Sequence, residues 1–254
     1  MTIPTKTPPT TKTTQAKTPT TKTGPARTRT ADTPARTDHR RTYPQLYTAS
    51  RTPALVDVPP LPFLMIDGRG DPNTAPEYAA AVQALYAVAY GVKFALRRAD
   101  GTDVAVMPLQ GLWSAPDMSD FTTGNKDAWD WTMMIMQPEA VTAELVAQAR
   151  SAAAGKAPES ALARLRLDVF PEGPSAQVLH LGPYADEAPT IEALHTFIKA
   201  RGLRRRGRHH EIYLGDPRRT APQRLRTIIR QPVAQRSPAA GAHVGSAGGA
   251  QVPG

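Results

Sequence analysis

Apolar and polar residues alternate along several short stretches of the chain, and a few longer stretches repeat apolar residues with a helical period. Alternation is typical of half-buried strands, whereas apolar residues at i, i+3 or i+4 and i+7 indicate a helix that buries one face. Strands are therefore predicted at 61–67, 104–113, 129–136, 162–170, 176–184, 209–214 and 224–229. Helices are predicted at about 76–98, 138–155 and 187–201.

The predicted elements repeat in the order strand, helix, strand, strand. Two local echoes support a duplication: MMIMQPE (133–139) resembles TIIRQPV (227–233), and DVPP (57–60) resembles DVFP (168–171). We therefore predict an α+β fold of two such modules side by side, in which antiparallel sheets carry helices on one face. The opposite face would form a concave ligand pocket, because ligands favour such a junction.

The strand at 209–214 places a carboxylate and a phenol on one side of a sheet. In HHEIYLGDP, Ile212 and Leu214 share one side, whereas Glu211 and Tyr213 share the other with His209. We expect Ile212 and Leu214 to pack against helices and Glu211 to face the cleft. If Glu211 is buried among aromatic rings, desolvation raises its pKa and suits it to acid or base catalysis. If it faces water, it is a polar surface residue, and the spacing leaves both interpretations open.

Tryptophan and tyrosine residues are candidates to surround this carboxylate. Trp129 and Trp131 share one strand face, and Trp113 ends the preceding strand. The remaining candidates are Tyr86 and Tyr90, one helical turn apart, and Tyr184 and Tyr213 in the second half of the chain. A box of such rings around a buried carboxylate suits a flat or cationic organic ligand. Packing in an ordinary core is the alternative for each ring.

Both ends of the chain have compositions that cannot form a core. Residues 1–51 are rich in Thr, Pro and Lys and residues 235–254 in Ala and Gly, so we predict disordered tails around an ordered domain at 52–234. Residues 1–50 carry a net charge of +7, and the remainder carries only +2. Because the only basic run in the domain is RGLRRRGR (201–208), we do not expect the core to bind nucleic acid.

Other features narrow the chemistry. The chain has no cysteine, which excludes disulfides and thiolate metal sites. His209 and His210 are adjacent on a predicted strand and point to opposite faces, so we expect no metal site. We find no segment with the length and apolarity of a membrane span and no apolar core of a secretory signal near the N-terminus. We therefore expect a cytoplasmic protein without membrane contact.

Three longer stretches carry a family resemblance: HLGPYADEAPTIEALHTFI, GRHHEIYLGDPRRTAPQRLRTIIRQPV and WDWTMMIMQPE. Together they resemble the GyrI-like small-molecule-binding domain over about 55–233, in its stand-alone form without a helix-turn-helix domain. The resemblance implies a tandem strand–helix–strand–strand fold with a central aromatic pocket. In relatives attached to transcription factors, this pocket holds cationic lipophilic drugs against an acidic residue.

Some stand-alone members of the family are hydrolases that open the cyclopropane ring of DNA-alkylating toxins of the yatakemycin and duocarmycin type. The resemblance matches the family's acidic position to Glu211 and its pocket tryptophans to Trp129 and Trp131, and it makes Tyr184 a plausible polar partner. We therefore predict a toxin-resistance hydrolase that needs no cofactor. Glu211 and Tyr184 would be catalytic, and the ligand-binding residues would be Trp113, Trp129, Trp131, Tyr86, Tyr90 and Tyr213.

Two alternatives to the hydrolase remain open. One is a protein that binds or sequesters cationic or aromatic small molecules without changing them. The other is a gyrase-inhibitor-like protein that acts by protein contact. The first needs the same aromatic box and acid as the enzyme, so the sequence does not separate them.

Overall fold

Residues 36–115 and 125–236 are the part of the chain that the computed structural model describes. The helices are α1 (His39–Thr42), α2 (Pro44–Tyr47), α3 (Pro76–Asp100), α5 (Ala143–Ala152), α6 (Glu159–Arg164) and α7 (Ala188–Ala200). The strands are β1 (Ala54–Val58), β2 (Leu61–Arg69), β3 (Leu109–Ser114), β4 (Asp130–Met136), β5 (Arg166–Phe170), β6 (Gly173–Leu181), β7 (Leu203–Arg205), β8 (His209–Tyr213) and β9 (Arg226–Gln235). The parts of the expected tails at 1–35 and 237–254 lie outside the described residues.

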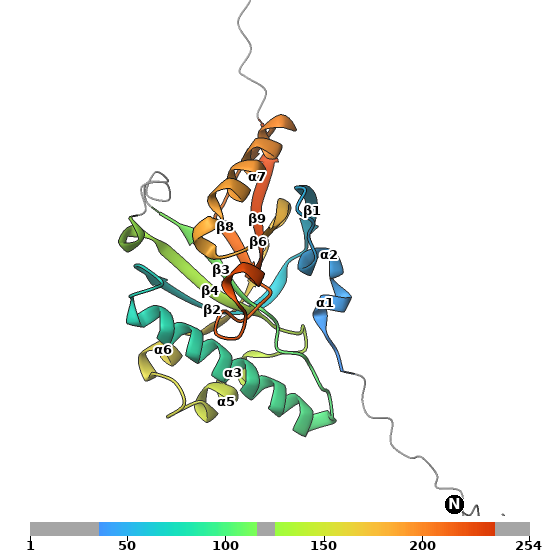
Figure 1. The fold of residues 1–254 in the computed structure, drawn as a ribbon. Coiled ribbons are helices and arrows are strands. Elements are labelled where there is room, and N and C mark those ends of the chain that lie inside the picture. The colour runs from blue at the N-terminus through green and yellow to red at the C-terminus, as the bar shows by residue number, and fades with distance from the viewer. Residues whose placement is uncertain (1–35, 116–124, 237–254) are drawn as a thin grey trace, which may run out of the picture. The chain divides into compact units, whose positions relative to one another are not determined.

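The strands join in one continuous antiparallel sheet. Its order is β1-β6-β9-β8-β3-β4-β2-β5, and β7 pairs with β9 beyond the end of β8 (Figure 1). The predicted repeat is present as β2-α3-β3-β4 and β6-α7-β8-β9, and the two repeats meet where β3 pairs with β8. The α+β fold and its tandem arrangement are therefore confirmed, although the two repeats share a single sheet.

The outermost strands are exchanged between the repeats. β1 precedes β2 in the chain but pairs with β6, and β5 precedes β6 but pairs with β2. The DVPP and DVFP echo lies at the ends of these two exchanged strands. Only Pro59 and Pro60 separate β1 from β2, although the two strands lie near opposite ends of the sheet. The three Cα–Cα steps from Val58 to Leu61 span at most about 11 Å, so the sheet curves until its ends approach each other and has an inner and an outer face.

The long helices cover different parts of the outer face (Figure 1). α3 packs mainly on β2 and β4, and α7 packs mainly on β6, β7 and β9. Leu194 and Ile198 of α7 form a small core with apolar residues of the sheet that include Ile229. The central strands β3 and β8 lie between the areas that the two helices cover. The prediction of helices on one face is therefore confirmed.

The predicted placement of Glu211 on the face opposite the helices is wrong. Glu211 pairs with Ile229 in the register of β8 and β9, so it lies on the outer face with α3 and α7. Ile212 was expected to pack against helices, but it pairs with Gln110 and Ile228 on the inner face. Alternation shows which residues share a face but not which face the helices cover, so the assignment was reversed.

The inner face contains a buried network of polar and charged side chains. Glu172 is 1% exposed, and its oxygens lie 2.8 Å from Nδ1 of His210 and 3.1 Å from Nη1 of Arg230. Burial opposes ionisation of Glu172, but the charges and hydrogen bonds of His210 and Arg230 outweigh it and lower its pKa to about 2. Nε2 of His210 lies 2.9 Å from Oε1 of Gln110. The buried charge is therefore paired and hydrogen-bonded, as a stable interior requires.

An N-terminal arm, residues 36–50, packs onto this inner face. Leu46 and Tyr47 of α2 are only 2% and 7% exposed. The backbone oxygen of Leu46 accepts a hydrogen bond from Nη2 of Arg230 at 2.6 Å, and Nε2 of Gln110 donates to the Tyr47 hydroxyl at 3.2 Å. The predicted disordered tail at 1–51 therefore does not hold for residues 36–51, which contain α1 and α2 and belong to the packed unit. At the other end, β9 reaches Gln235, the first residue of the second expected tail.

α3 is the one helix in the described part of the chain that is long and apolar enough, by length and composition, to cross a membrane. The expectation that no segment meets these criteria is therefore wrong. However, α5 and α6 pack against α3, and so do β2 and β4. These are the surroundings of a core helix.

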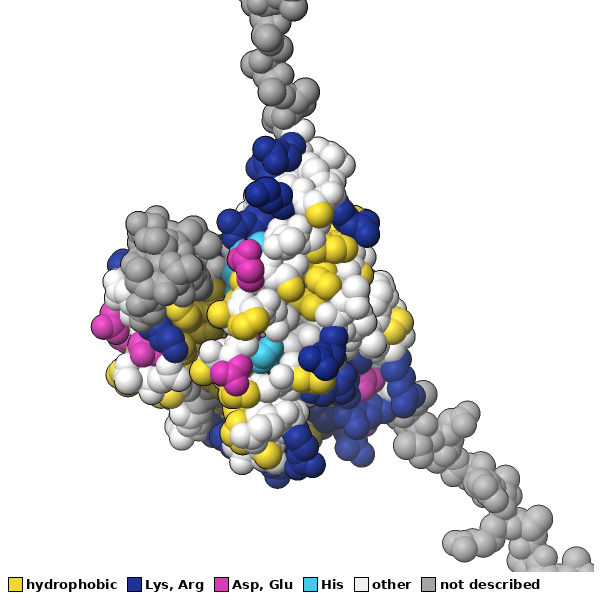
Figure 2. Space-filling model, turned by 45° about the horizontal axis from the view of Figure 1, so that its top comes forward, with side chains coloured by type: hydrophobic (Ala, Val, Ile, Leu, Met, Phe, Trp, Pro, Cys, Tyr) yellow, Lys and Arg dark blue, Asp and Glu magenta, His cyan; other side chains and the backbone are white. Residues whose placement is uncertain are grey.

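The basic run at 201–208 lies where α7 ends and β7 begins. Arg201, Arg204 and Arg205 are exposed. Figure 2 shows Lys and Arg side chains gathered at this upper end of the molecule. Part of the run forms the short strand β7, which pairs with β9.

Candidate active site

Glu211 lies in the middle of β8, between α3 and α7, with its side chain 15% exposed. Nε2 of His209 lies 3.1 Å from Oε1 of Glu211, and the Tyr213 hydroxyl donates to Oε2 at 2.8 Å. Both partners come from the same strand face, because residues two apart in a strand share a face. Burial alone would raise the pKa of Glu211, but these two hydrogen bonds and the charge of His209 hold it below its ordinary value. Glu211 is therefore ionised at neutral pH, and the raised pKa expected for a buried carboxylate is not found here.

A second carboxyl group, Glu187, lies beside Glu211 in the residue directly before α7. It is 5% exposed and interacts with Glu211 and with Thr227 of β9. Burial, followed by the negative charge of Glu211, raises the pKa of Glu187 to about 9. Two adjacent carboxyl groups cannot both ionise at low cost, so they separate into one acid and one base. At neutral pH the pair carries one negative charge on Glu211, and Glu187 keeps its proton.

Two polar atoms beside the carboxyl pair are available to a bound molecule. Oε1 of Glu187 and Oγ1 of Thr227 are buried, and neither makes a hydrogen bond of good geometry within the described residues. Buried polar atoms are normally satisfied by protein, water or ligand. The surroundings of the carboxyl pair are therefore suited to a polar ligand group or a water molecule.

A glycine opposite Glu211 makes room for this arrangement. Gly111 of β3 pairs with Glu211 across the central strands. A Cβ atom at Gly111 would lie 2.8 Å from Nε1 of Trp113 and 3.0 Å from the Tyr213 hydroxyl oxygen. These two groups are themselves hydrogen-bonded at 3.1 Å. The Tyr213 hydroxyl thus accepts from Trp113 while it donates to Glu211, and this chain of hydrogen bonds fixes the carboxylate.

Aromatic rings surround the carboxylate on the side of α3. Tyr78 stacks on Trp113 with ring centroids 6.2 Å apart and meets Trp131 edge-on at 5.3 Å. Trp129 meets Trp113 edge-on at 5.7 Å. Trp131 is 1% exposed, and its ring lies directly over Gly68 of the neighbouring strand. In this structure Trp131 therefore forms the floor beneath Tyr78, Trp113 is also buried at 4% exposure, and Trp129 is only partly buried.

The predicted tyrosines occupy different positions around the site. Tyr184 is 40% exposed and meets Tyr213 edge-on with centroids 5.6 Å apart. Burial, with the nearby charges of Glu187 and Glu211, raises the pKa of Tyr184 to about 12, so its hydroxyl keeps its proton. Tyr86 interacts with Tyr184 at the edge of the site, whereas Tyr90 lies one turn further along α3 and is 48% exposed. The phenol in direct contact with Glu211 is Tyr213.

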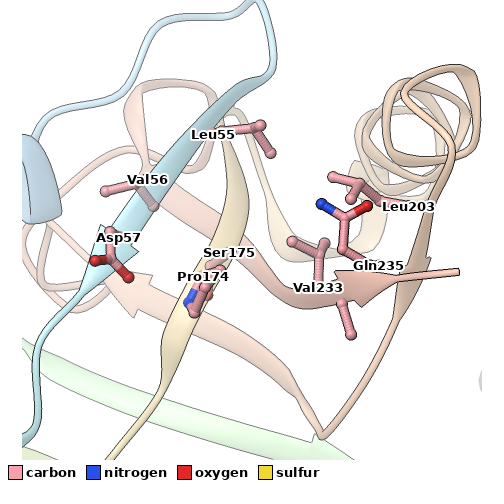
Figure 3. A pocket seen from close by; sticks show the side chains of 9 residues that line it. Leu55, Val56, Asp57, Pro174, Ser175, Leu203, Val233 and Gln235 are labelled. Atoms are coloured by element: carbon pink, nitrogen blue, oxygen red, sulfur yellow. The ribbon is translucent and has the colours of Figure 1, made fainter. Parts of the chain in front are cut away.

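The described residues offer no group of three or more His, Cys, Asp or Glu side chains that could hold a metal ion. His209 and His210 point to opposite faces as expected: one contacts Glu211, and the other contacts Glu172 on the inner face. A separate hollow of about 350 Å³ lies between β1, β6, β7 and β9, where Leu55 lies across the gap from Leu203 (Figure 3). None of the predicted site residues borders this hollow.

A family comparison agrees with this geometry. The model of the GyrI-like small molecule binding domain matches residues 51–234. The chain belongs to the GyrI-like family. The match begins after the N-terminal arm and includes both strand–helix–strand–strand repeats. A GyrI-like domain is thus a small-molecule-binding domain, and the polar and aromatic site on its outer face is the candidate position for the ligand.

Solved structures from Listeria innocua are similar to this GyrI-like chain. One is described as an uncharacterized conserved protein, with 38% identity and a TM-score of 0.72, and it covers 78% of this chain and 99% of its own. Another is described as a hydrolase, with 38% identity, a TM-score of 0.70 and coverage of 78% and 98%. A comparison with curated proteins gave no match.

Glu187, Tyr78 and His209 belong to the site but were not among the sequence-based site candidates. Glu187 stands in YADEAPT, where an acidic residue before Pro189 has the ordinary signature of a helix start. Tyr78 lies in the helix predicted at about 76–98, where apolar residues with a helical period indicate core packing rather than a site. The signal available for Glu187 was its position at a helix N-terminus within a motif of the family, next to Tyr184.

Proposed function

We propose that this protein is a hydrolase that adds water to the cyclopropane ring of flat, DNA-alkylating genotoxins of the yatakemycin and duocarmycin type. The observation that carries the proposal is the carboxyl pair, in which an ionised Glu211 lies beside a protonated Glu187 in a site bordered by aromatic rings. An ionised buried carboxylate is a general base, and aromatic rings bind flat ligands. The description of a relative at 38% identity as a hydrolase supports the same reaction class.

In the proposed reaction, Glu211 accepts a proton from a water molecule whose oxygen attacks the ring methylene. The new C–O bond forms as the cyclopropane C–C bond breaks, and the electron pair of that bond moves into the conjugated dienone, whose oxygen becomes a phenolate. The proton on Glu211 then passes to this oxygen, so the net change is addition of one water molecule. Tyr184, exposed and protonated at the edge of the site, donates a hydrogen bond to the developing phenolate. Protonated Glu187 keeps the pair at a single negative charge, and no cofactor takes part.

The site would act by positioning as much as by basicity. His209 and Tyr213 hold both oxygens of Glu211, so the carboxylate is oriented before the ligand enters. Oriented reactants avoid much of the entropic cost of a bimolecular step. Trp113 and Trp129 would stack on the planar units of the toxin. Because the reaction would protect cellular DNA, the proposal places it in the cytoplasm.

A second candidate function is binding of cationic aromatic molecules without chemistry. The observation that favours it is the negative charge of the pair, enclosed by the rings of Tyr78, Trp113 and Tyr213. Aromatic rings together with a carboxylate recognise organic cations. Both functions use the same residues, so only the fate of the ligand distinguishes them.

The test is Glu211→Gln, assayed by mass spectrometry for addition of water to a duocarmycin-type compound. As the base, Glu211 should contribute at least about a hundredfold to turnover, so the variant should lose that factor while binding of a neutral aromatic ligand changes little. Glu192→Gln on the exposed side of α7 is the matched control and should turn over as the wild type does.

The outcomes separate the two candidates. Many turnovers by the wild type and a large loss in Glu211→Gln support the hydrolase. An unchanged toxin at stoichiometric protein, with weaker binding of cations in Glu211→Gln, supports binding without chemistry. Wild-type turnover in folded Glu211→Gln protein would remove Glu211 from the reaction.

A further inference from the structure

Three aromatic residues form a row along α3, leading away from the carboxyl pair. The row is Tyr86, Tyr90 and Phe94, spaced four residues apart, so the rings lie on one side of the helix. Adjacent ring centroids are 6.5 Å and 6.3 Å apart, with interplanar angles of 32° and 28°. The rings therefore lie in nearly parallel orientation over two helical turns, or about 12 Å.

The outer two rings are unusually exposed for their size. Tyr90 is 48% exposed and Phe94 is 46% exposed, although the same helix buries residues such as Leu85 and Val92 completely. Single exposed apolar residues are normal on protein surfaces, whereas a contiguous aromatic patch marks a binding surface. Within the described part of the chain, the ring contacts of Phe94 are with Tyr90 alone.

The inner end of the row lies near the candidate active site. Tyr86 is half-buried and interacts with Tyr184, which in turn meets Tyr213 edge-on. Tyr213 donates its hydroxyl hydrogen to Glu211. The rings of Tyr184 and Tyr213 thus lie beside the carboxylate, and the row on α3 begins nearby at Tyr86. A ligand whose reactive end lies at Glu211 would pass Tyr184 and Tyr86 if it were longer than the inner site.

We propose that Tyr90 and Phe94, approached over Tyr86, form an outer subsite for the second and third planar units of an elongated aromatic ligand. The proposal rests on the proposed function, because it assumes that the reactive unit of the ligand is held at Glu211. It assigns a ligand length to the site: a single ring system would fill the inner part, and additional units linked in a line would stack along α3. The exposed faces of the row explain how the surface tolerates units of different substitution, because stacking requires only a flat face.

The experiment compares binding of neutral, amide-linked chains of one, two and three indole units to the wild type and to the double variant Tyr90→Ala/Phe94→Ala. Alanine is compatible with an exposed helix position, so the variant should fold. In the wild type, each added unit that stacks on an aromatic side chain should raise the affinity by about fivefold to 150-fold. The double variant should lose most of this rise and bind the single unit as the wild type does. Val169→Ala, at an exposed position on β5, is the control and should keep the full length dependence.

Several results would overturn the proposal. Equal length dependence in the wild type and the double variant would do so, as would failure of the wild type to bind any of the three chains. A change in sedimentation of the double variant with unchanged affinities would instead assign the row to contact between copies of the chain. The proposed function fails separately if the chains of indole units bind with the expected length dependence but a cyclopropane-bearing compound is not hydrolysed.

Discussion

Replacing Leu46 with alanine tests whether the N-terminal arm is part of the folded domain. Leu46 is 2% exposed and belongs to the same core cluster as Phe63, Met134 and Ile212. Truncating a buried leucine to alanine costs about 2–5 kcal/mol, because both the transfer of the side chain and the cavity count. In a domain of this size each kcal/mol lowers the melting temperature by about 2–4 °C, so the expected fall is roughly 4–20 °C.

The assay is thermal unfolding followed by circular dichroism, with Leu55→Ala as the matched control. Leu55 lies on edge strand β1 and is 48% exposed, so the same substitution should change stability by less than about 0.5 kcal/mol. Equal shifts in the two variants would refute the packing described for the arm. Removal of residues 1–50, which composition alone suggests is harmless, should also destabilise the domain, because it takes away Leu46 and Tyr47.

Three further changes probe the site and the network behind it. Tyr47→Phe keeps the ring but removes the hydroxyl that accepts from Nε2 of Gln110, which should lower the free energy of unfolding by about 1–3 kcal/mol. An unchanged midpoint in denaturant unfolding would show that this hydrogen bond contributes nothing to stability. The pKa of Glu187 is raised to about 9 by folding, so its contribution to stability is present below its ordinary pKa of 4.5 and is lost as pH rises towards 9. Glu187→Gln cannot ionise, so its melting temperature should rise relative to the wild type between pH 5 and pH 9, and parallel curves would contradict the raised pKa. Trp131→Ala should lower the free energy of unfolding by about 3–5 kcal/mol, because Trp131 is only 1% exposed. If the variant keeps its stability but loses ligand affinity, the ring is instead an open surface on which the ligand stacks.

The architecture could be predicted because hydrophobic periodicity depends mainly on local sequence. The alternation around Ile212 identified β8 and showed that Glu211 and Tyr213 share a face. It could not show which face α3 and α7 cover, because that depends on where each helix packs along a sheet shared by both repeats. The family resemblance directed attention to Glu211. The alternation does not show that His209 contacts Glu211, because sharing a face does not fix a hydrogen bond.

The arm and the second carboxyl group were missed for different physical reasons. Composition averaged over residues 1–51 is dominated by Thr, Pro and Lys, which conceals the short apolar segment with Leu46 and Tyr47. This segment is ordered by tertiary contacts with Arg230 and Gln110, which no local pattern displays. Glu187 looks like a residue of a helix start, and its raised pKa arises only because β8 brings Glu211 beside it.

The exchange of β1 and β5 has a consequence for how the chain reaches its native state. Ala54 of β1 pairs with Gln177 of β6, so an edge of the second repeat is completed only by residues more than a hundred positions upstream. Such pairings raise the contact order, and the entropy of closing long loops must be lost before they stabilise the sheet. Neither repeat can cover its own edge without the other, so an isolated half would present an unpaired strand to other chains. The two repeats should therefore fold slowly and as one cooperative unit, although each contains a complete strand–helix–strand–strand module.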